Sequence, residues 1–207
     1  MTTYATLVTD IKSFMEDDGT EFTTAIDTFI DLTELKLSRD LVVPAFRKRA
    51  TSALSQNDGF LTLPPDLVVL ENLHLIQDYV RSILLLRSDE FMMEFWPNRK
   101  ATGTPKYYSY FDTNTLYVAP TPAENISVEI SYRRRLPGLS STNTTNWLSE
   151  NAFDCLLYGC LTEASSFNRN DQMMQKYMAL YQGAVQAVNR EGNMRLSIDN
   201  FYQKSEG

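Results

Sequence analysis

The sequence predicts an α+β protein in which helix pairs from the two ends of the chain form a four-helix bundle around an inserted β module. Apolar residues follow a helical period of about 3.6 in residues 1–44 and 138–190, and the period falls toward two in residues 45–137. With 207 residues, 43% of them hydrophobic, the chain is long enough for a sizeable core. We expect the module to be an antiparallel sandwich or barrel, and residues 191–207 to form an extended C-terminal arm.

Charge is distributed unevenly along the chain. The net charge is −7, and residues 1–45 hold nine acidic and three basic residues, which gives that segment −6. Tight phosphate binding would need a clustered basic surface, so it is not indicated. A solvated acidic face is the simpler interpretation, and a surface past which DNA moves without adhering is the alternative.

The sequence predicts a soluble protein that is not secreted. No N-terminal apolar segment follows Met1, and no apolar run approaches the roughly 20 residues needed to cross a bilayer. The two cysteines, Cys155 and Cys160, are five positions apart in a helical pattern, so their side chains point in different directions. We expect buried or half-buried free thiols and no disulfide between them.

Two helices are predicted before residue 44. The first covers Tyr4 to Met15, where apolar residues recur at the i, i+3, i+4 and i+7 positions of an amphipathic helix. The break that follows contains Gly19, suited to a left-handed cap, and Thr20, suited to the N-cap of the next helix. The second stripe begins at Phe22 and continues to about Arg39.

The β module is predicted to begin with short strands separated by turn residues. The expected strands cover residues 46–54, 60–63, 67–76 and 79–87, the last two as a hairpin. A short amphipathic helix then begins near Ser88 and ends at Pro97, and we expect it to cover the sheet.

A second hairpin occupies Gly103 to Pro122. Gly103 permits positive φ and Pro105 fixes its own φ, so an extended segment is expected to begin there. Residues 112–115 supply turn chemistry before a second apolar strand. After Pro122, apolar and polar residues alternate from Ile126 to Tyr132, as expected for a strand with one buried face.

The chain returns to helices after a polar linker. Residues 140–146 are rich in Ser, Thr and Asn and are predicted to lack a core. Helical stripes then cover residues 153–164, capped by Ser149 or Asn151, and residues 174–190. The remaining residues lose this period but stay apolar, so we expect an arm that becomes ordered on a partner, with docking along a sheet edge to satisfy its backbone groups. The residues predicted to dock are Arg195, Leu196, Ile198, Phe201 and Tyr202.

Few residues point to catalysis. The one histidine, His74, lies in a predicted apolar strand without a nucleophile motif beside it, so a structural role is expected. The sequence has no glycine-rich phosphate loop and no paired zinc ligands, so no cofactor or metal is expected. Carboxylate pairs such as Asp89 and Glu90 lie where helix boundaries favour acids in any case.

Two further features, besides the arm, are candidates for binding. The run Arg133-Arg134-Arg135 at a strand end is suited to phosphate, but a solvated rim or an ion-pair site between subunits is the simpler interpretation. The aromatic residues of the second hairpin are suited to a sugar or base platform, but packing between strands is the simpler interpretation. These aromatic residues are Tyr107, Tyr108, Tyr110, Phe111 and Tyr117.

With these motifs in this order, the chain resembles the head-to-tail adaptor proteins of tailed bacteriophages, also called tail tubular or head-completion proteins. The resemblance runs through most of the chain, although Asn125 and Ile126 stand where the family often has an aromatic residue. The residues that carry it are Leu63-Pro64-Pro65-Asp66, Gly103-Thr104-Pro105-x-x-Tyr108, Leu116-x-x-x-Pro120-x-Pro122, Val128-x-Ile130-x-Tyr132-Arg133, Trp147-Leu148, Leu156-Leu157-Tyr158-Gly159, Tyr177 and Tyr181.

The resemblance implies a structural virion protein without enzymatic activity, made in the host cytoplasm. It would be one subunit of a ring, of twelve copies in such phages, that joins the portal to a tail or nozzle protein and lets DNA pass without sequence-specific binding. The arm would dock on the portal. The rim charges expected between subunits are Asp17 and Asp18 on one side and Arg47, Arg49, Arg133, Arg134 and Arg135 on the other.

Two other classes of function compete with this prediction. The first is a β module that binds a glycan or single-stranded nucleic acid through the aromatic hairpin, with the helices as support. The second is a hydrolase that uses carboxylates.

Overall fold

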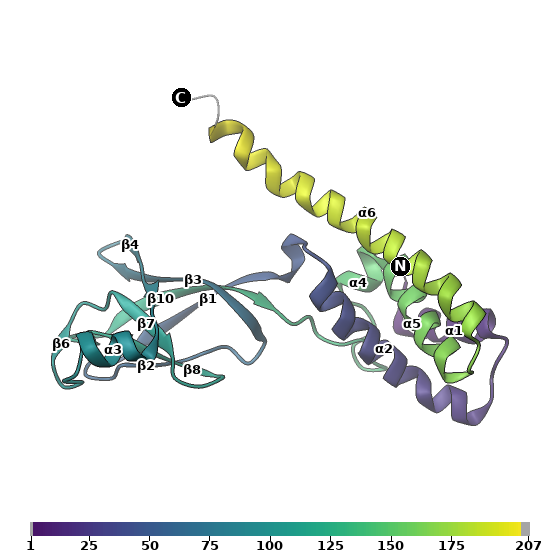
Figure 1. Ribbon diagram of the computed structural model, residues 1–207, viewed down its shortest axis with the longest axis horizontal. Helices are drawn as coiled ribbons and strands as arrows, with labels where there is room; N and C mark the ends of the chain where they lie inside the picture. Colours follow the sequence, from purple (N-terminus) through teal and green to yellow (C-terminus); the bar gives the residue numbers. More distant parts are fainter. Residues whose placement is uncertain (1, 204–207) are drawn as a thin grey trace. The chain divides into compact units, whose positions relative to one another are not determined.

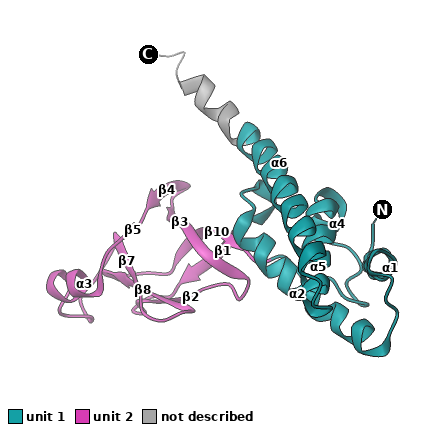
Figure 2. Cartoon of the chain, turned by 45° about the vertical axis from the view of Figure 1, so that its right-hand side comes forward, with its two compact units in different colours: residues 1–46, 136–207 teal, residues 47–135 magenta. Residues whose placement is uncertain are grey.

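A computed structural model describes the backbone of residues 2–203 and the side chains of residues 2–195 (Figure 1). The chain divides into two compact units, coloured separately in Figure 2. The helical unit consists of Met1–Phe46 and Leu136–Gly207, and the β unit consists of Arg47–Arg135. The protein is therefore a mixed α+β protein, and each unit is described by itself below.

The helical unit begins with the two predicted N-terminal helices. Helix α1 covers Tyr4–Met15, and α2 covers Thr20–Asp40. The residue in the left-handed conformation after α1 is Glu16 (φ 52°), whereas Gly19 has φ −55° and is the N-cap of α2. The predicted roles of Gly19 and Thr20 were therefore wrong, because the first helix already ends at Glu16 and Thr20 is inside the second.

A one-turn 3-10 helix, Pro44–Phe46, follows α2, and three further α-helices belong to this unit, two of which differ from the prediction. A one-turn helix, α4, precedes α5, with Asn146 as its N-cap, so neither Ser149 nor Asn151 caps α5. Helix α6 does not end near Arg190 but continues to Gln203, with a total length of 33 residues, so the expected extended arm is wrong for the residues up to Gln203. The bounds are Trp147–Asn151 for α4, Phe153–Phe167 for α5 and Asp171–Gln203 for α6.

Helix α5 lies at the centre of the unit. It packs on α1, α2, α4 and α6, and nine of its residues are buried. Gly159 marks the closest approach, because a Cβ atom there would lie 2.3 Å from Cγ2 of Thr33 on α2. The ring of Tyr181 on α6 would be 3.3 Å away. Glycine is thus what allows α2, α5 and α6 to meet at this point.

The segment predicted to be a polar linker is held in place by α2. Both carboxylate oxygens of Glu34 accept a hydrogen bond from the backbone N–H of Leu139, and one also accepts from the Asn146 side chain at 2.7 Å. Burial raises the pKa of Glu34, although these hydrogen bonds oppose the shift. Leu139, the residue just before this segment, is itself buried in the helical core.

The two thiols are free and buried, as predicted. Burial is the main cause that raises the pKa of Cys155 and of Cys160, in each case to about 12. Because the thiolate is the reactive form, both should be poor nucleophiles in the folded chain.

We expect the folded protein to resist iodoacetamide at pH 8. A thiol with a pKa near 12 has about a thousandfold less thiolate at this pH than an unperturbed cysteine. Mass spectrometry should find almost no label on the native protein and two labels after denaturation. Rapid labelling of the native chain would contradict the buried positions of Cys155 and Cys160.

The β unit contains two four-stranded sheets and one two-stranded sheet. The first sheet is antiparallel in the order β1 (Arg47–Leu54), β10 (Ile126–Arg134), β3 (Leu67–Gln77) and β4 (Val80–Ile83). The second has the order β2 (Phe60–Thr62), β8 (Thr115–Ala119), β7 (Tyr107–Tyr110) and β5 (Leu85–Leu86). The third pairs β6 (Thr102–Gly103) with β9 (Thr121–Pro122).

Both predicted hairpins are confirmed, but the module is not purely antiparallel. Strands β3 and β4 form one hairpin and β7 and β8 form the other. However, β5 pairs with β7 in parallel, and so does β6 with β9. Gly103, expected to begin a strand with positive φ, lies instead in the short β6, and no glycine in the described chain has positive φ.

The two four-stranded sheets share one core. Apolar side chains of β10 alternate into it as predicted, with Val128, Ile130 and Tyr132 fully buried. The Tyr132 hydroxyl donates to Asp66 at 2.7 Å, and Lys48 donates to the other oxygen of the same carboxylate at 2.8 Å. Helix α3, Asp89–Phe95, lies outside this core and begins at the predicted Ser88.

Candidate interaction surfaces

The C-terminal part of α6 is the segment predicted to dock on a partner. Of the predicted residues, only the side chain of Arg195 is described, and it is exposed; Leu196, Ile198, Phe201 and Tyr202 lie on the described backbone of α6, but their side chains are outside the described residues. Met194, just before them, is 68% exposed. Helix α6 therefore presents an exposed apolar side chain, Met194, beyond Gly192, which is the last buried residue among those up to Arg195.

A set of contacts fixes α6 just before this segment. The Asn189 side chain accepts a hydrogen bond from the N–H of Val42 at 2.7 Å and donates to the carbonyl of Asp40 at 2.8 Å. A Cβ atom on Gly192 would lie 2.4 Å from the Val42 carbonyl oxygen, so the backbones touch here. The Tyr181 hydroxyl donates to Asp40, and burial together with this bond raises the pKa of Tyr181. The helix is thus clamped to the end of α2 before it continues.

The acidic pair predicted at the subunit rim lies between α1 and α2, and its members differ. Asp17 is half-buried, and its carboxylate accepts hydrogen bonds from Gly19 N–H at 3.0 Å and from the Asn168 side chain at 3.2 Å. Asp18 is exposed. Asp17 therefore supports the turn within its own subunit, and Asp18 is better placed to meet a partner.

The basic residues predicted at the rim lie at one end of the first sheet. Residue Arg47 on β1 is directly opposite Arg133 on β10, and Arg49 is opposite Ser131. These positions alternate with the buried Ile130 and Tyr132, so they share the sheet face turned away from the core. Arg47 forms an exposed ion pair with Glu71 at 3.1 Å.

The other two arginines of the run are arranged differently. Arg134 is half-buried, and its Nε atom has no hydrogen-bond partner among the described residues. Arg135 is exposed and donates its backbone N–H to Asp66. The structure therefore brings Arg47, Arg49 and Arg133 together as a basic patch, a name used below for these three residues, while Asp17 and Asp18 belong to the other unit.

The aromatic hairpin does not form one exposed platform. Tyr108 and Tyr117 are buried on opposite faces of the second sheet, and Tyr107 packs edge-on against Phe91 of α3. Only Tyr110 and Phe111 are largely exposed. Five rings divided between two faces do not offer the continuous surface that stacked bases or sugars would need.

An apolar edge runs along β4 and β5. The chain passes from the first sheet to the second through the buried Leu84, so one extended segment is the edge of both sheets. Tyr79, at the β3–β4 turn, is fully exposed. The exposed apolar side chains that follow it along this segment are Val80, Ile83, Leu85 and Leu86. A long apolar edge strand is an aggregation hazard unless a partner covers it.

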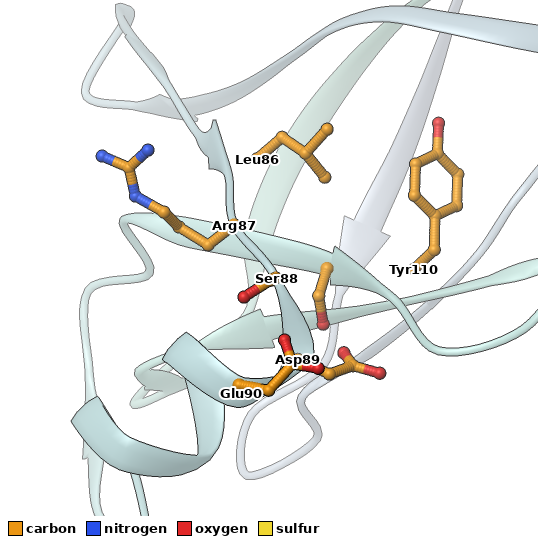
Figure 3. Close-up of a pocket in the computed structure, with 7 residues that line it drawn as sticks. Leu86, Arg87, Ser88, Asp89, Glu90 and Tyr110 are labelled. Carbon is orange, nitrogen blue, oxygen red and sulfur yellow. The ribbon is translucent and has the colours of Figure 1, made fainter.

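A pocket of about 520 Å³ lies beside this edge, where β5 leads into α3 (Figure 3). Its lining includes Arg87, Asp89 and Glu90, with Tyr110 across from them. A backbone hydrogen bond and the Ser88 side chain lower the pKa of Glu90. An acid that stays ionised near neutral pH is poorly suited to donate a proton, so Glu90 does not have the chemistry of a general acid.

Sequence reasoning missed the apolar edge and the surroundings of α3. In the sequence, the β4–β5 segment has the pattern of a single apolar strand, and only the sheet order shows that it is an edge.

Among the residues that the structure describes, none of the helices could span a bilayer.

One of two comparisons with known proteins gives a clear family assignment. Comparison with curated protein sequences finds no match. The model of the SU10 adaptor protein family, in contrast, matches residues 2–199, which includes all of the β unit and most of the helical unit. A match of this length covers both units rather than one motif, and so the chain belongs to the SU10 adaptor protein family.

Proposed function

We propose that this protein is a structural head-to-tail adaptor of a tailed phage virion. In this proposal, copies of the chain form a ring, twelve in number as the resemblance implies, that joins the portal to the tail and surrounds the DNA channel. The observation that carries it is the adaptor-family match over residues 2–199. An adaptor acts by holding partners in place, so its functional sites are interaction surfaces.

Each unit has a proposed partner. The helical unit forms the ring wall, and the end of α6 docks on the portal. Because the backbone of this segment is helical up to Gln203, helix-in-groove docking replaces the extended strand expected from the sequence. The β unit meets the tail or nozzle protein through the apolar edge, whose exposed side chains need a cover. DNA passes the acidic helical unit without sequence-specific binding.

Neighbouring copies are proposed to meet through opposite charges. A closed ring requires two different surfaces on each subunit, one complementary to the other. The exposed Asp18 and the basic patch provide such a pair, in line with the acidic character of the N-terminal segment. Exposed ion pairs contribute about 0–1 kcal/mol each and are screened by salt, so this contact sets orientation more than affinity.

We expect Arg49→Glu to weaken ring formation about tenfold at low salt, because reversal replaces attraction by repulsion. The double variant Arg49→Glu with Asp18→Arg should restore it. Lys100→Glu changes an exposed basic residue of the same unit outside the patch and serves as the control. Sedimentation velocity at two salt concentrations measures the effect. Equal ring formation by Arg49→Glu and wild type would remove the patch from the interface.

Electron microscopy of the chain mixed with purified portal tests the main proposal. The expected result is a ring of density on the portal that is absent without the chain. A protein that stays monomeric beside portal rings, and that binds an oligosaccharide instead, would refute the adaptor role and support the rival glycan-binding module.

A further inference from the structure

Helix α3 covers only part of the outer face of the second sheet. Its Met92 packs on Tyr117 and Ala119 in a small cluster that is separate from the main core of the β unit. Next to this cluster lies a pocket of about 380 Å³, closed on one side by α3 and on the other by the β7–β8 turn. The lining residues used below are Asp89, Met93, Trp96, Arg99, Phe111 and Tyr117.

Tyr117 gives this pocket an unpaired polar group. Its side chain is only 5% exposed, yet its hydroxyl has no hydrogen-bond partner among the described residues. The ring is held by close neighbours, since a Cβ atom on Gly59 would already lie 3.0 Å from it and the Phe60 ring is 5.6 Å away. A buried hydroxyl without a partner is costly, and binding of an acceptor or donor would remove that cost.

Arg99 places a cation over the same ring. Its guanidinium lies 5.0 Å from the centre of the Tyr117 ring, and Arg99 forms no ion pair with any carboxylate of residues 2–195. A guanidinium is planar and always charged, and it binds carboxylates through two parallel hydrogen bonds. Stacking on the ring already restricts the Arg99 side chain, so Arg99 loses less conformational entropy when a ligand binds.

The remaining lining residues restrict the ligand. Trp96, Met93 and Phe111 supply apolar walls, and Asp89 is the only acid. One positive and one negative side chain leave the pocket without the excess of positive charge that nucleic acid or another polyanion needs. The volume is near the lower end for small-molecule sites and fits one or two side chains rather than a polymer.

We propose that this pocket receives an acidic segment of the tail protein: an apolar side chain fills the space between Trp96 and Phe111, and a neighbouring carboxylate binds Arg99 and the Tyr117 hydroxyl. The proposal rests on the adaptor function proposed above. It adds an anchor of defined chemistry to the apolar edge through which the β unit is proposed to meet the tail. Anchors of this kind, seated in a pocket at an interface, commonly carry much of the binding energy.

The first experiment uses a small probe, 3-phenylpropionate, which combines an aromatic ring with a carboxylate. Binding to the full chain is followed by NMR through the indole resonance of Trp96. Trp147, the only other tryptophan, lies in the helical unit and is the internal reference. We expect 3-phenylpropionate to shift only the Trp96 resonance. The uncharged amide of the probe, 3-phenylpropionamide, should bind at least tenfold more weakly. If neither tryptophan resonance shifts at probe concentrations up to the solubility limit, the proposal is refuted.

Substitutions separate this role from a structural one. Tyr117→Phe should weaken probe binding about tenfold. It should not lower thermal stability, because the hydroxyl that is removed has no hydrogen-bond partner among the described residues. Tyr132→Phe is the matched control, since it removes a hydroxyl that donates to Asp66 and should lower stability while leaving the probe unaffected. Arg99→Gln should reduce probe affinity at least tenfold, and the affinity of Arg99→Lys should lie between those of wild type and Arg99→Gln. Unchanged probe affinity in Tyr117→Phe and Arg99→Gln refutes the assignment.

The second experiment identifies the occupant. Rings assembled on portal from wild type or Arg99→Gln are incubated with purified tails, and tail attachment is counted by electron microscopy. We expect normal rings and at least tenfold weaker tail binding for Arg99→Gln. Failure of wild type to form rings would refute the adaptor function. If Arg99→Gln no longer binds the probe but its rings bind tails normally, the tail is not the occupant of the pocket, and the adaptor function is unaffected. If Arg99→Gln fails to form rings, the occupant is a neighbouring copy of the chain.

Discussion

Removal of residues 196–207 is expected to abolish attachment to the portal while both units stay folded. Asn189 and Gly192 hold α6 against the residues that follow α2, and both remain in the shortened chain. The residues removed include Leu196 and also Ile198 and Phe201, which lie four and seven positions after the exposed Met194. Circular dichroism should show a folded protein, and co-sedimentation with portal rings should show loss of binding to the background level.

Two controls show whether docking requires a helix. Ser197→Pro keeps the length and the apolar residues but interrupts the helix, at a cost of about 3 kcal/mol or more. We expect it to bind portal as poorly as the truncated chain, whereas an arm that docks as an extended strand would tolerate it. A chain that ends at Gln203 should bind normally. Portal binding by the chain that ends at Arg195 would place the docking site elsewhere.

Substitution of Gly159 by alanine is expected to destabilise the helical unit by about 1–3 kcal/mol. The added methyl group would lie 2.3 Å from Cγ2 of Thr33, and Thr33 is fully buried with a stiff β-branched side chain. The helices α2 and α5 would have to move apart, which opens space in the core that both share. Thermal unfolding followed by far-ultraviolet circular dichroism measures the change.

Gly183 provides a control of opposite sign. It lies in α6, is exposed, and a Cβ atom there would meet nothing within 4 Å. Gly183→Ala should therefore stabilise the helix by about 0.5–1 kcal/mol, because alanine loses less backbone entropy than glycine. If Gly159→Ala raised the unfolding temperature as Gly183→Ala is expected to, close packing at Gly159 would be refuted.

Local patterns predicted the parts of the fold that depend on neighbours in sequence. The stripe from Tyr4 to Met15 and the alternation from Ile126 to Tyr132 specify a helix and a half-buried strand by period alone, and both are present. Ser88 followed by two acids specified the start of α3. The free buried thiols were also predicted.

Features set by distant contacts were not predictable in the same way. The parallel pairing of β5 with β7 joins segments that no turn connects, so the turn rules that identified the hairpins give no information about it. The 140–146 segment appeared to be a free linker because its anchor, Glu34, lies in α2. The helical end of α6 was detectable in principle, since residues 194, 198 and 201 have i, i+4, i+7 spacing.

The candidate sites follow the same division. The sequence identified the arginines of the basic patch, because charge is visible residue by residue, but it could not show that Arg47 and Arg133 are cross-strand partners. The pocket beside α3 was out of reach. Its key feature is a hydroxyl without a partner, and an unmade hydrogen bond leaves no trace in the order of residues.

The β unit enters and leaves the helical chain through neighbouring strands. Its first strand begins at Arg47, and Arg47 is the direct partner of Arg133 near the end of its last strand. The two crossing points are therefore adjacent, as in domains that are inserted into a host fold without disturbing it. In evolutionary terms, a module with two neighbouring joints can be replaced by another while the core of the helical unit stays unchanged.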